Sequence, residues 1–184
     1  MPELPDIAIL TDAFQATLAG RPVLATEAPE PLVMRATPGE LEALSGQSLE
    51  SVTRRGKFIV LQLSRDRIVV NAMLTGRLGL GRPGSKPLPS TAWTLRLGSR
   101  AASPDGWAAW THGADWLPAD SAEVELRYRD PTRMGKIYLL PAGVTRVVAG
   151  WDELGPDADD PALDLATWRK RIQPHRGELK NLLR

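Results

Sequence analysis

Residues 48–72, SLESVTRRGKFIVLQLSRDRIVVNA, contain three short apolar-rich runs, which are Ser48–Arg54, Lys57–Leu63 and Arg67–Ala72. The breaks between them, Arg55-Gly56 and Ser64-Arg65-Asp66, are short and polar, as in hairpin turns. This stretch therefore predicts three consecutive antiparallel strands.

The segments around this stretch extend the prediction to a fold. Three more strand-like runs follow, Ala92–Leu97, Glu123–Arg129 and Lys136–Leu140. Before it, residues 5–18 have apolar side chains at helical spacing and stop at Gly20 and Pro22, and residues 38–45 suggest a second short helix. The sequence predicts an α+β fold in which an N-terminal helix packs on an antiparallel β-sandwich or barrel.

Composition changes mark the expected domains. The β-rich domain would span residues 1–150, with an insertion at about 99–121 that contains Trp107, Trp110 and Trp116. These tryptophans either pack against the sheet or stack on bases. Residues 151–184 read as the beginning of a second, helical domain, with helices expected at Leu163–Ile172 and Gly177–Leu183.

Composition also limits the class of protein. The 184 residues include 42% hydrophobic residues and no cysteine. Disulfides and thiolate metal sites are therefore excluded, and His112 and His175 alone argue against a zinc site. No apolar stretch is long enough to cross a membrane and no secretory signal opens the chain, so we expect a metal-free cytoplasmic or nuclear protein.

The charge is distributed unevenly, although the net charge is only +1. Residues 150–165 contain six acidic and no basic residues, whereas residues 168–184 contain six basic residues against one acid, Glu178. The basic segment suits a polyanion or forms a solvated helix face, and charge alone leaves both readings open.

The chain begins MPELPD, residues 1–6. If Met1 is removed, Pro2 becomes a free secondary amine whose neighbour is the carboxylate of Glu3. A terminal amine titrates near pH ~8, so part of it is unprotonated and nucleophilic at neutral pH. Such an amine can add to a sugar C1′ and form an iminium. The alternative is that Pro2 and Pro5 only stiffen the approach to a helix.

Three further segments contain residues suited to polyanion binding. Arg54, Arg55 and Lys57 surround a glycine turn and can hold phosphates, or can simply keep a hairpin tip soluble. In NAMLTGR, residues 71–77, Asn71 precedes Leu74, which is either a wedge between bases or a core leucine.

The third segment is DPTRMG, residues 130–135, between two strands. It offers a cation, Arg133, and an apolar side chain, Met134, on a tight turn. In isolation it is an ordinary β-turn.

The ordered set MPELPD, RRGK, LTGRL and DPxRxG resembles the formamidopyrimidine-DNA glycosylase/endonuclease VIII family of base-excision repair enzymes. LGPD at 154–157 and ELKNLLR at 178–184 resemble the start of that family's helix–two-turn–helix DNA-binding domain. The resemblance implies a DNA glycosylase with AP-lyase activity on damaged double-stranded DNA, located at the nucleoid in a bacterium. A monomer is the expected state of a repair domain that faces a DNA groove. Pro2 would be the nucleophile, Glu3 the proton shuttle and Lys57 a contact to the damaged base or the adjacent phosphate. The implied DNA contacts are Arg54, Arg55, Asn71, Leu74, Arg133, Met134 and Lys180.

The sequence departs from the family pattern at several of these positions. Asp6 replaces the usual Glu, and Asn71 and Leu74 replace His and Met. Thr132 and Met134 replace the Arg and Phe that, with the Met, fill the gap left by the flipped base, so recognition of the opposite base is affected.

The family also completes its helical domain and adds a zinc finger or a zincless equivalent, whereas this sequence stops at Arg184 without cysteine. We therefore expect no cofactor in this chain and weak or no glycosylase activity from these residues alone. The competing interpretations are a non-catalytic nucleic-acid-binding module and a structural or interaction domain.

Overall fold

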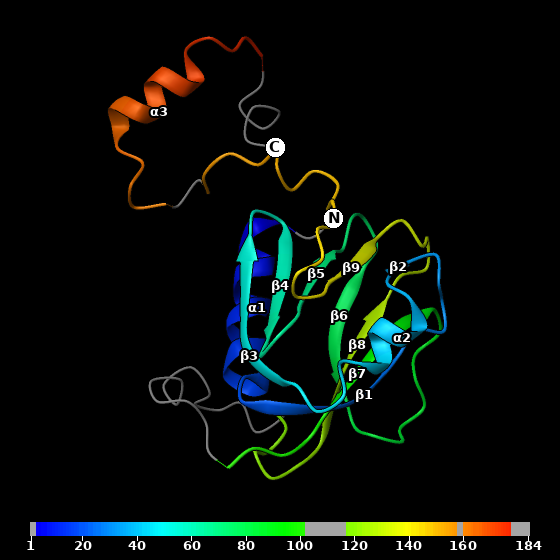
Figure 1. Cartoon of the computed structure of the whole chain (residues 1–184). Coiled ribbons are helices and arrows are strands. Elements are labelled where there is room, and N and C mark those ends of the chain that lie inside the picture. The colour runs from blue at the N-terminus through cyan, green and yellow to red at the C-terminus, as the bar shows by residue number, and fades with distance from the viewer. Residues whose placement is uncertain (1–2, 102–116, 158–159, 178–184) are drawn as a thin grey trace. The chain divides into compact units, whose positions relative to one another are not determined.

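A computed structural model of the chain describes residues 3–101, 117–157 and 160–177, and the fold is given over these ranges (Figure 1). The chain divides into two units, Met1–Val148 and Ala149–Arg184, and each is described by itself. Within the described ranges, no helix has the length and apolar character needed to cross a bilayer.

The first helix, α1, spans Leu4–Leu18, and Glu3 is its N-cap residue. Asp6 accepts a hydrogen bond from the backbone nitrogen of Glu3 at 2.9 Å, which satisfies a donor at the helix start. Asp6 therefore has a structural role at the start of the helix. The side chains of Ile7, Thr11, Phe14 and Leu18 are buried, as the helical spacing predicted.

The C-terminal end of α1 is held by two arginines from outside the helix. Arg21, which is fully buried, donates from Nε to the carbonyl of Thr17 at 2.8 Å. Arg100 donates to the carbonyls of Ala16 and Ala19, each at 2.6 Å. These guanidinium groups satisfy carbonyls that the helix cannot pair internally, and their positive charge complements the helix dipole.

Nine strands form the sheet system, in the order β2-β9-β5-β4-β3-β1-β7-β8-β6. Their bounds are β1 Arg21–Glu27, β2 Met34–Arg35, β3 Ser48–Arg55, β4 Phe58–Leu63, β5 Arg67–Asn71, β6 Arg77–Gly81, β7 Thr91–Leu97, β8 Val124–Arg129 and β9 Lys136–Leu140. A short helix, α2, spans Pro38–Glu42, and a turn then leads to Gly46. All pairs are antiparallel except β2 with β9, so the predicted α+β fold is confirmed.

Strand β1 joins the two layers because it pairs with β3 through Arg21 and Pro22 and then with β7 through residues 23–27. The register shifts between Val23 and Ala25, where the strand passes from one layer to the other. Side chains of both layers meet in one core that includes Leu61, Val70 and Trp93. The indole Nε1 of Trp93 donates to the hydroxyl of Thr26 at 2.9 Å, so this buried ring leaves no polar atom unpaired.

Three strands were not predicted from the sequence, and each has a physical reason. Strand β1 contains Pro22, β2 has two residues, and β6 contains Gly79 and Gly81. A Cβ on Gly81 would lie 2.6 Å from the guanidinium carbon of Arg127, so that glycine gives the arginine room to cross the edge strand. The predicted helix at 38–45 is shorter than expected and ends at Glu42.

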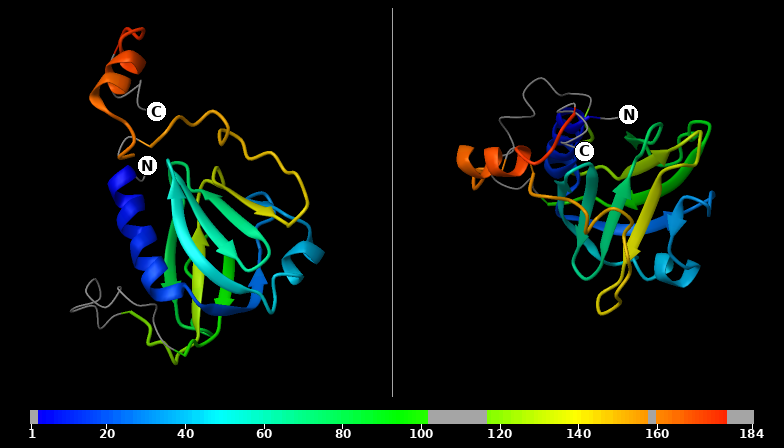
Figure 2. Two further views of the ribbon diagram at one scale, coloured as in Figure 1. Left: turned by 60° about the vertical axis from the view of Figure 1, so that its left-hand side comes forward. Right: turned by 90° about the horizontal axis from the view of Figure 1, so that it is seen from above.

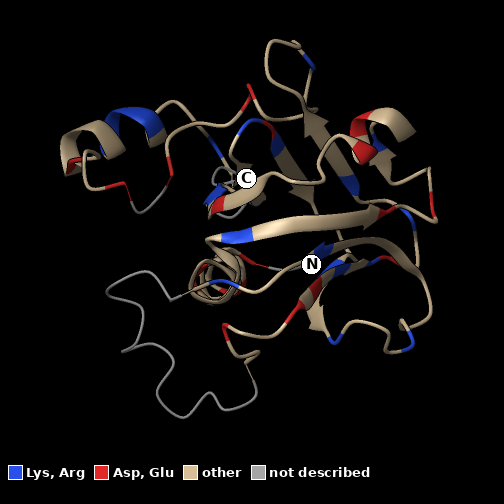
Figure 3. Ribbon diagram, turned by 60° about the horizontal axis from the view of Figure 1, so that its bottom comes forward, with Lys and Arg blue, Asp and Glu red and all other residues tan. Residues whose placement is uncertain are grey.

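The second unit contains one described helix, α3, at Leu165–Ile172. Asp164 is the N-cap and accepts a hydrogen bond from the backbone of Thr167 at 2.7 Å, which starts the helix two residues later than predicted. Its last turn is basic, as Figure 3 shows, and carries Arg169, Lys170 and Arg171. The expected helix at Gly177–Leu183 lies outside the described residues from 178 onward.

Asp66 ties the β4–β5 turn to two distant segments of the first unit. Its carboxylate accepts hydrogen bonds from the amide of Gln47 at 2.7 Å and the backbone of Ala142 at 3.0 Å, and it pairs with Arg65 at 3.0 Å. The bond from Arg65 is the largest cause that lowers the pKa of Asp66 to about 2, and burial only partly opposes it.

We predict that Asp66 makes folding stability pH-dependent in acid. Because the pKa of Asp66 is lower in the folded than in the unfolded chain, its stabilisation is present above pH ~4 and is lost as pH falls toward about 2. Urea unfolding of wild type and Asp66→Asn should differ most above pH ~4 and converge in acid. A difference that stays constant with pH would contradict this role.

Candidate nucleic-acid interface

The start of α1 and the β3–β4 turn lie at the same end of the first unit (Figures 1 and 2). Gln15 fixes this arrangement because its side-chain oxygen accepts a hydrogen bond from the backbone nitrogen of Val52 in β3. From Gln15 back to Leu4 the helix is about 16 Å long at ~1.5 Å per residue. From Val52 to Arg55 the strand advances about 10 Å at ~3.3 Å per residue, and the chain then reverses at Gly56 and Lys57. The N-cap residue Glu3 therefore lies at the same end of the unit as the basic turn.

The basic turn is built by two strand ends and a glycine. Arg54 and Arg55 end β3, Gly56 has φ +53° and Lys57 precedes β4. An L side chain adopts that φ at a cost, so glycine permits the tight reversal between Arg55 at the end of β3 and Phe58 at the start of β4. The side chains of Arg54, Arg55 and Lys57 are half-buried.

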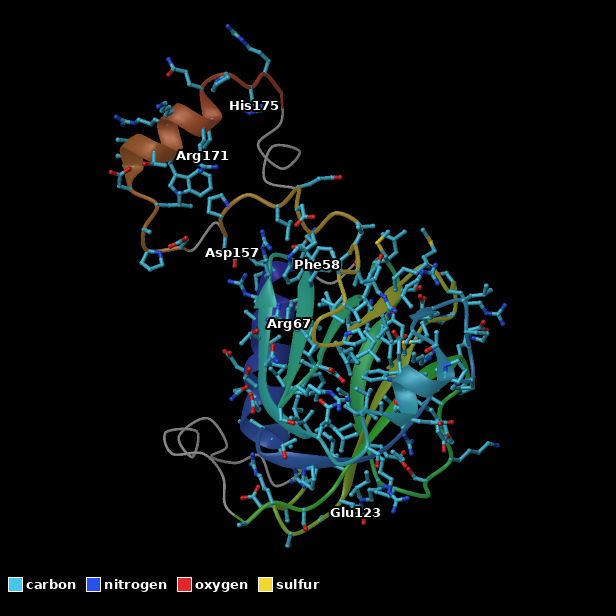
Figure 4. All side chains as sticks on the ribbon, in the orientation of Figure 1. Phe58, Arg67, Glu123, Asp157, Arg171 and His175 are labelled. Carbon is cyan, nitrogen blue, oxygen red and sulfur yellow. The ribbon has the colours of Figure 1, made fainter. Side chains whose placement is uncertain are left out.

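Strand pairing places Asn71, another predicted site residue, and its neighbour Lys136 at this same end of the sheet. Arg55 pairs with Phe58, Phe58 with Asn71, and Asn71 with Lys136, on β3, β4, β5 and β9. Figure 4 labels Phe58 at this end and Glu123 at the opposite end of the same unit. The loops that follow Asn71 and precede Lys136 therefore leave the sheet side by side.

The first of these loops, residues 72–76, presents apolar side chains to solvent. Leu74 is 48% exposed and Met73 is 39% exposed, so the core-leucine alternative for Leu74 is wrong. Met73 has φ +49°, and its backbone nitrogen donates to the side-chain oxygen of Asn71 at 3.2 Å. A non-glycine residue in this conformation stores strain of about 1 kcal/mol or more, which is common in binding loops.

The second loop, residues 130–135, also has an exposed apolar side chain and a non-glycine residue at positive φ. Met134 is 45% exposed, and Arg133 has φ +57°. The Nζ of Lys136 donates to the carbonyls of Arg133, Met134 and Gly135 at 3.0–3.2 Å and so braces the loop from below. The guanidinium of Arg133 pairs with Glu30 at 2.7 Å.

A buried carboxylate, Asp130, joins the two loops. It is 2% exposed, and it accepts hydrogen bonds from the hydroxyl of Thr75 at 2.5 Å, the hydroxyl of Thr132 at 3.1 Å and the backbone nitrogen of Gly135 at 2.7 Å. Burial disfavours the charge of Asp130, but these hydrogen bonds outweigh burial and hold its pKa below the ordinary value. Thr75 and Thr132 also contact each other at 2.6 Å between their hydroxyl oxygens.

The hydroxyl of Tyr128 fills the space beneath both loops. It donates to Asp130 at 3.4 Å, and burial raises the pKa of Tyr128 and keeps it protonated. A Cβ on Gly76 would lie 2.2 Å from this hydroxyl oxygen, and one on Gly135 would lie 1.8 Å from it. Glycine is thus required at both positions for the loops to close over Tyr128.

The structure brings most of the predicted site residues to one end of the first unit: Glu3, Arg54, Arg55, Lys57, Asn71, Leu74, Arg133 and Met134. Pro2 and Lys180, together with the three tryptophans of the insertion, lie outside the described residues. Sequence reasoning missed Thr75 and Asp130 as a pair, because a contact across 55 positions leaves no local signal. In the described ranges, no group of three His, Asp or Glu side chains is placed to hold a metal ion.

Comparison with known proteins identifies a matching family and relatives of this chain. A family model described as "Formamidopyrimidine-DNA glycosylase N-terminal domain" matches residues 1–137. The chain is 27% identical over 186 residues to the formamidopyrimidine-DNA glycosylase of Heliobacterium modesticaldum, covering all of this chain and 60% of that protein. It is 28% identical over 191 residues to that of Thermomicrobium roseum, covering all of this chain and 61% of that protein.

A solved structure has the same fold. The chain resembles the Lactococcus lactis formamidopyrimidine-DNA glycosylase non-covalently bound to DNA that contains an AP site, with a TM-score of 0.59 and 17% identity over 76% of this chain and 45% of that one. The chain spans about 60% of the length of the curated relatives described above. The match over residues 1–137 shows that this chain belongs to the formamidopyrimidine-DNA glycosylase family.

Proposed function

We propose that this chain is the catalytic part of a base-excision-repair DNA glycosylase with AP-lyase activity. Family membership supports the repair function. The observation that carries the proposal is the meeting, at one end of the first unit, of the start of α1, the basic β3–β4 turn and two joined loops with exposed apolar tips. A reactive amine, cations for phosphates and an apolar wedge are the parts that excision of a flipped nucleotide needs.

The nucleophile in this proposal is the secondary amine of Pro2 after loss of Met1. Its lone pair adds to C1′ of the damaged nucleotide as the glycosidic bond breaks. The base leaves with the electron pair of that bond and takes a proton from solvent, and the N–H proton of the amine passes to the Glu3 carboxylate. The C1′–O4′ bond then opens, Glu3 gives this proton to O4′, and an iminium joins Pro2 to the sugar. The Glu3 carboxylate next takes a C2′ proton, the C3′–O bond breaks with its electron pair leaving on the phosphate, which cuts the strand, and hydrolysis of the iminium frees the amine.

The remaining residues would hold the DNA for this chemistry. Lys57, Arg54 and Arg55 supply positive charge for phosphates beside the reacting sugar. Leu74 and Met134 would enter the base stack as one wedge, because Asp130 joins their loops. Thr132 has no guanidinium to offer the base left without its partner, and its hydroxyl already contacts Asp130 and Thr75.

Phosphate contacts supply much of the affinity of a protein for DNA, and their contribution is largest at low salt. Abasic-site duplex at low salt is therefore the substrate of choice for testing the chemistry, because it needs no base excision.

We predict that borohydride traps a covalent adduct between the Met1-processed chain and abasic-site duplex. Protein that retains Met1 should bind the duplex but form no adduct, since its Pro2 nitrogen is an amide. Glu3→Gln should slow trapping roughly 100-fold, as expected on losing a proton-transfer group. Asp12→Asn, which changes an exposed acid on the same helix, should behave like wild type.

These outcomes separate the alternatives. If the processed protein binds the duplex but forms no adduct, the chain is a nucleic-acid-binding module and not an enzyme. If it does not bind the duplex even at low salt, the chain is a structural domain. An adduct that persists in Met1-retained protein would assign the chemistry to a lysine.

We also predict that Leu74 and Met134 act together through Thr75. In a double-mutant cycle on abasic-site DNA binding, Leu74→Ala and Met134→Ala should be non-additive by more than ~0.5 kcal/mol. In a Thr75→Val background, which removes the hydroxyl that donates to Asp130, this coupling should fall toward zero. Thr53→Val, at an exposed position on β3, should leave it unchanged. Coupling that survives Thr75→Val would show that the loops do not depend on this contact.

A further inference from the structure

Two arginines lie directly opposite each other on paired strands beside the apolar loops. Arg77 begins β6 and pairs in register with Arg129, which ends β8. The inward positions of β8 are Leu126 and Tyr128, both fully buried, so Arg129 is on the outer face of the sheet. Arg77 is likewise exposed. Opposed side chains on antiparallel strands have Cβ atoms about 5 Å apart, and like charges at this spacing destabilise a sheet.

Other arginines on β7 and β8 have carboxylate partners. Arg96 pairs with Glu123 at 2.7 Å, and Arg127 pairs with Glu125. Over the described part of the chain, neither Arg77 nor Arg129 makes an ion pair with a carboxylate. The positive charges of Arg77 and Arg129, which have no carboxylate partner among the described residues, therefore lie together at the end of β8 that leads into Asp130 and the second loop.

Backbone carbonyls hold both guanidinium groups in place. Arg77 donates from Nη1 to the carbonyls of Gly76 at 2.8 Å and Leu74 at 3.4 Å. Arg129 donates from Nε to the carbonyl of Pro89 at 3.1 Å. These bonds use one nitrogen of each guanidinium and leave the other N–H groups of both heads available. They also connect Arg77 directly to Leu74 at the tip of the first loop.

We propose that Arg77 and Arg129 form a phosphate-binding site for the DNA backbone beside the inserted Leu74. A phosphodiester is an anion with two oxygens that accept hydrogen bonds from guanidinium forks, and its charge would relieve the repulsion between the two arginines. The guanidinium of Arg77 is hydrogen-bonded to the carbonyl of Leu74. When Leu74 enters the base stack, Arg77 would therefore lie beside the DNA backbone next to that point. The site rests on the proposed function for its ligand, DNA.

Salt dependence of binding to undamaged duplex tests the site. In anisotropy titrations of the full chain between about 20 and 200 mM salt, Arg77→Gln and Arg129→Gln should each reduce the slope of log K against log salt by about 1 and weaken low-salt binding several-fold. Arg96→Gln, an exposed but paired arginine, is the matched control and should keep the wild-type slope. Slopes of Arg77→Gln and Arg129→Gln that equal that of Arg96→Gln would overturn the site.

Thermal unfolding gives a readout that needs no DNA. Arg129→Gln should unfold at the same temperature as wild type or higher, because it removes a like-charge pair. Inorganic pyrophosphate should raise the Tm of wild type more than that of the Arg77→Gln/Arg129→Gln double variant. If wild type binds no duplex and pyrophosphate raises both Tm values equally, the site does not exist. If the slopes change as expected but borohydride traps no adduct, the phosphate site stands and the enzymatic proposal fails.

Discussion

The packing of α1 against β3 is the constraint on which the candidate site depends. The hydrogen bond between Gln15 and the backbone of Val52 fixes how far along the strand the helix lies. One turn of sliding would move Glu3 about 5.4 Å relative to Lys57, which exceeds the tolerance of a proton transfer or an attack on carbon. Arg21 and Arg100 hold the other end of the helix through its last carbonyls. The N-terminal end of α1 is therefore positioned by contacts made far from it.

The second constraint is the buried carboxylate of Asp130. A buried charge is costly unless hydrogen bonds replace its water, and Asp130 receives them from both loops and from Tyr128. Met73 and Arg133 are held nearby at positive φ. Backbone strain of this kind persists only where the surrounding structure fixes it, and here the two loops with apolar tips are joined through Asp130.

The sequence predicted the parts of the fold that have strong local periodicity. The strands at 48–72 and α1 alternate or repeat apolar residues at the correct spacing. Strand β6 was missed because Gly79 and Gly81 weaken the strand signal, whereas in the structure β6 pairs with β8 and Gly81 leaves room for the side chain of Arg127. The basic turn and both apolar loops were predicted as separate motifs. Their connection through Thr75 and Asp130, and the opposition of Arg77 and Arg129, depend on strand pairing that no short segment encodes.

The identity of the residue that carries the DNA adduct tests the central claim most directly. The borohydride-reduced complex with abasic-site duplex can be digested with protease and nuclease, and the modified peptide sequenced by mass spectrometry. We expect the sugar remnant on the nitrogen of Pro2, in a peptide that begins PELPD. A remnant on Nζ of Lys57, or on any other lysine, would contradict the role given to the start of α1.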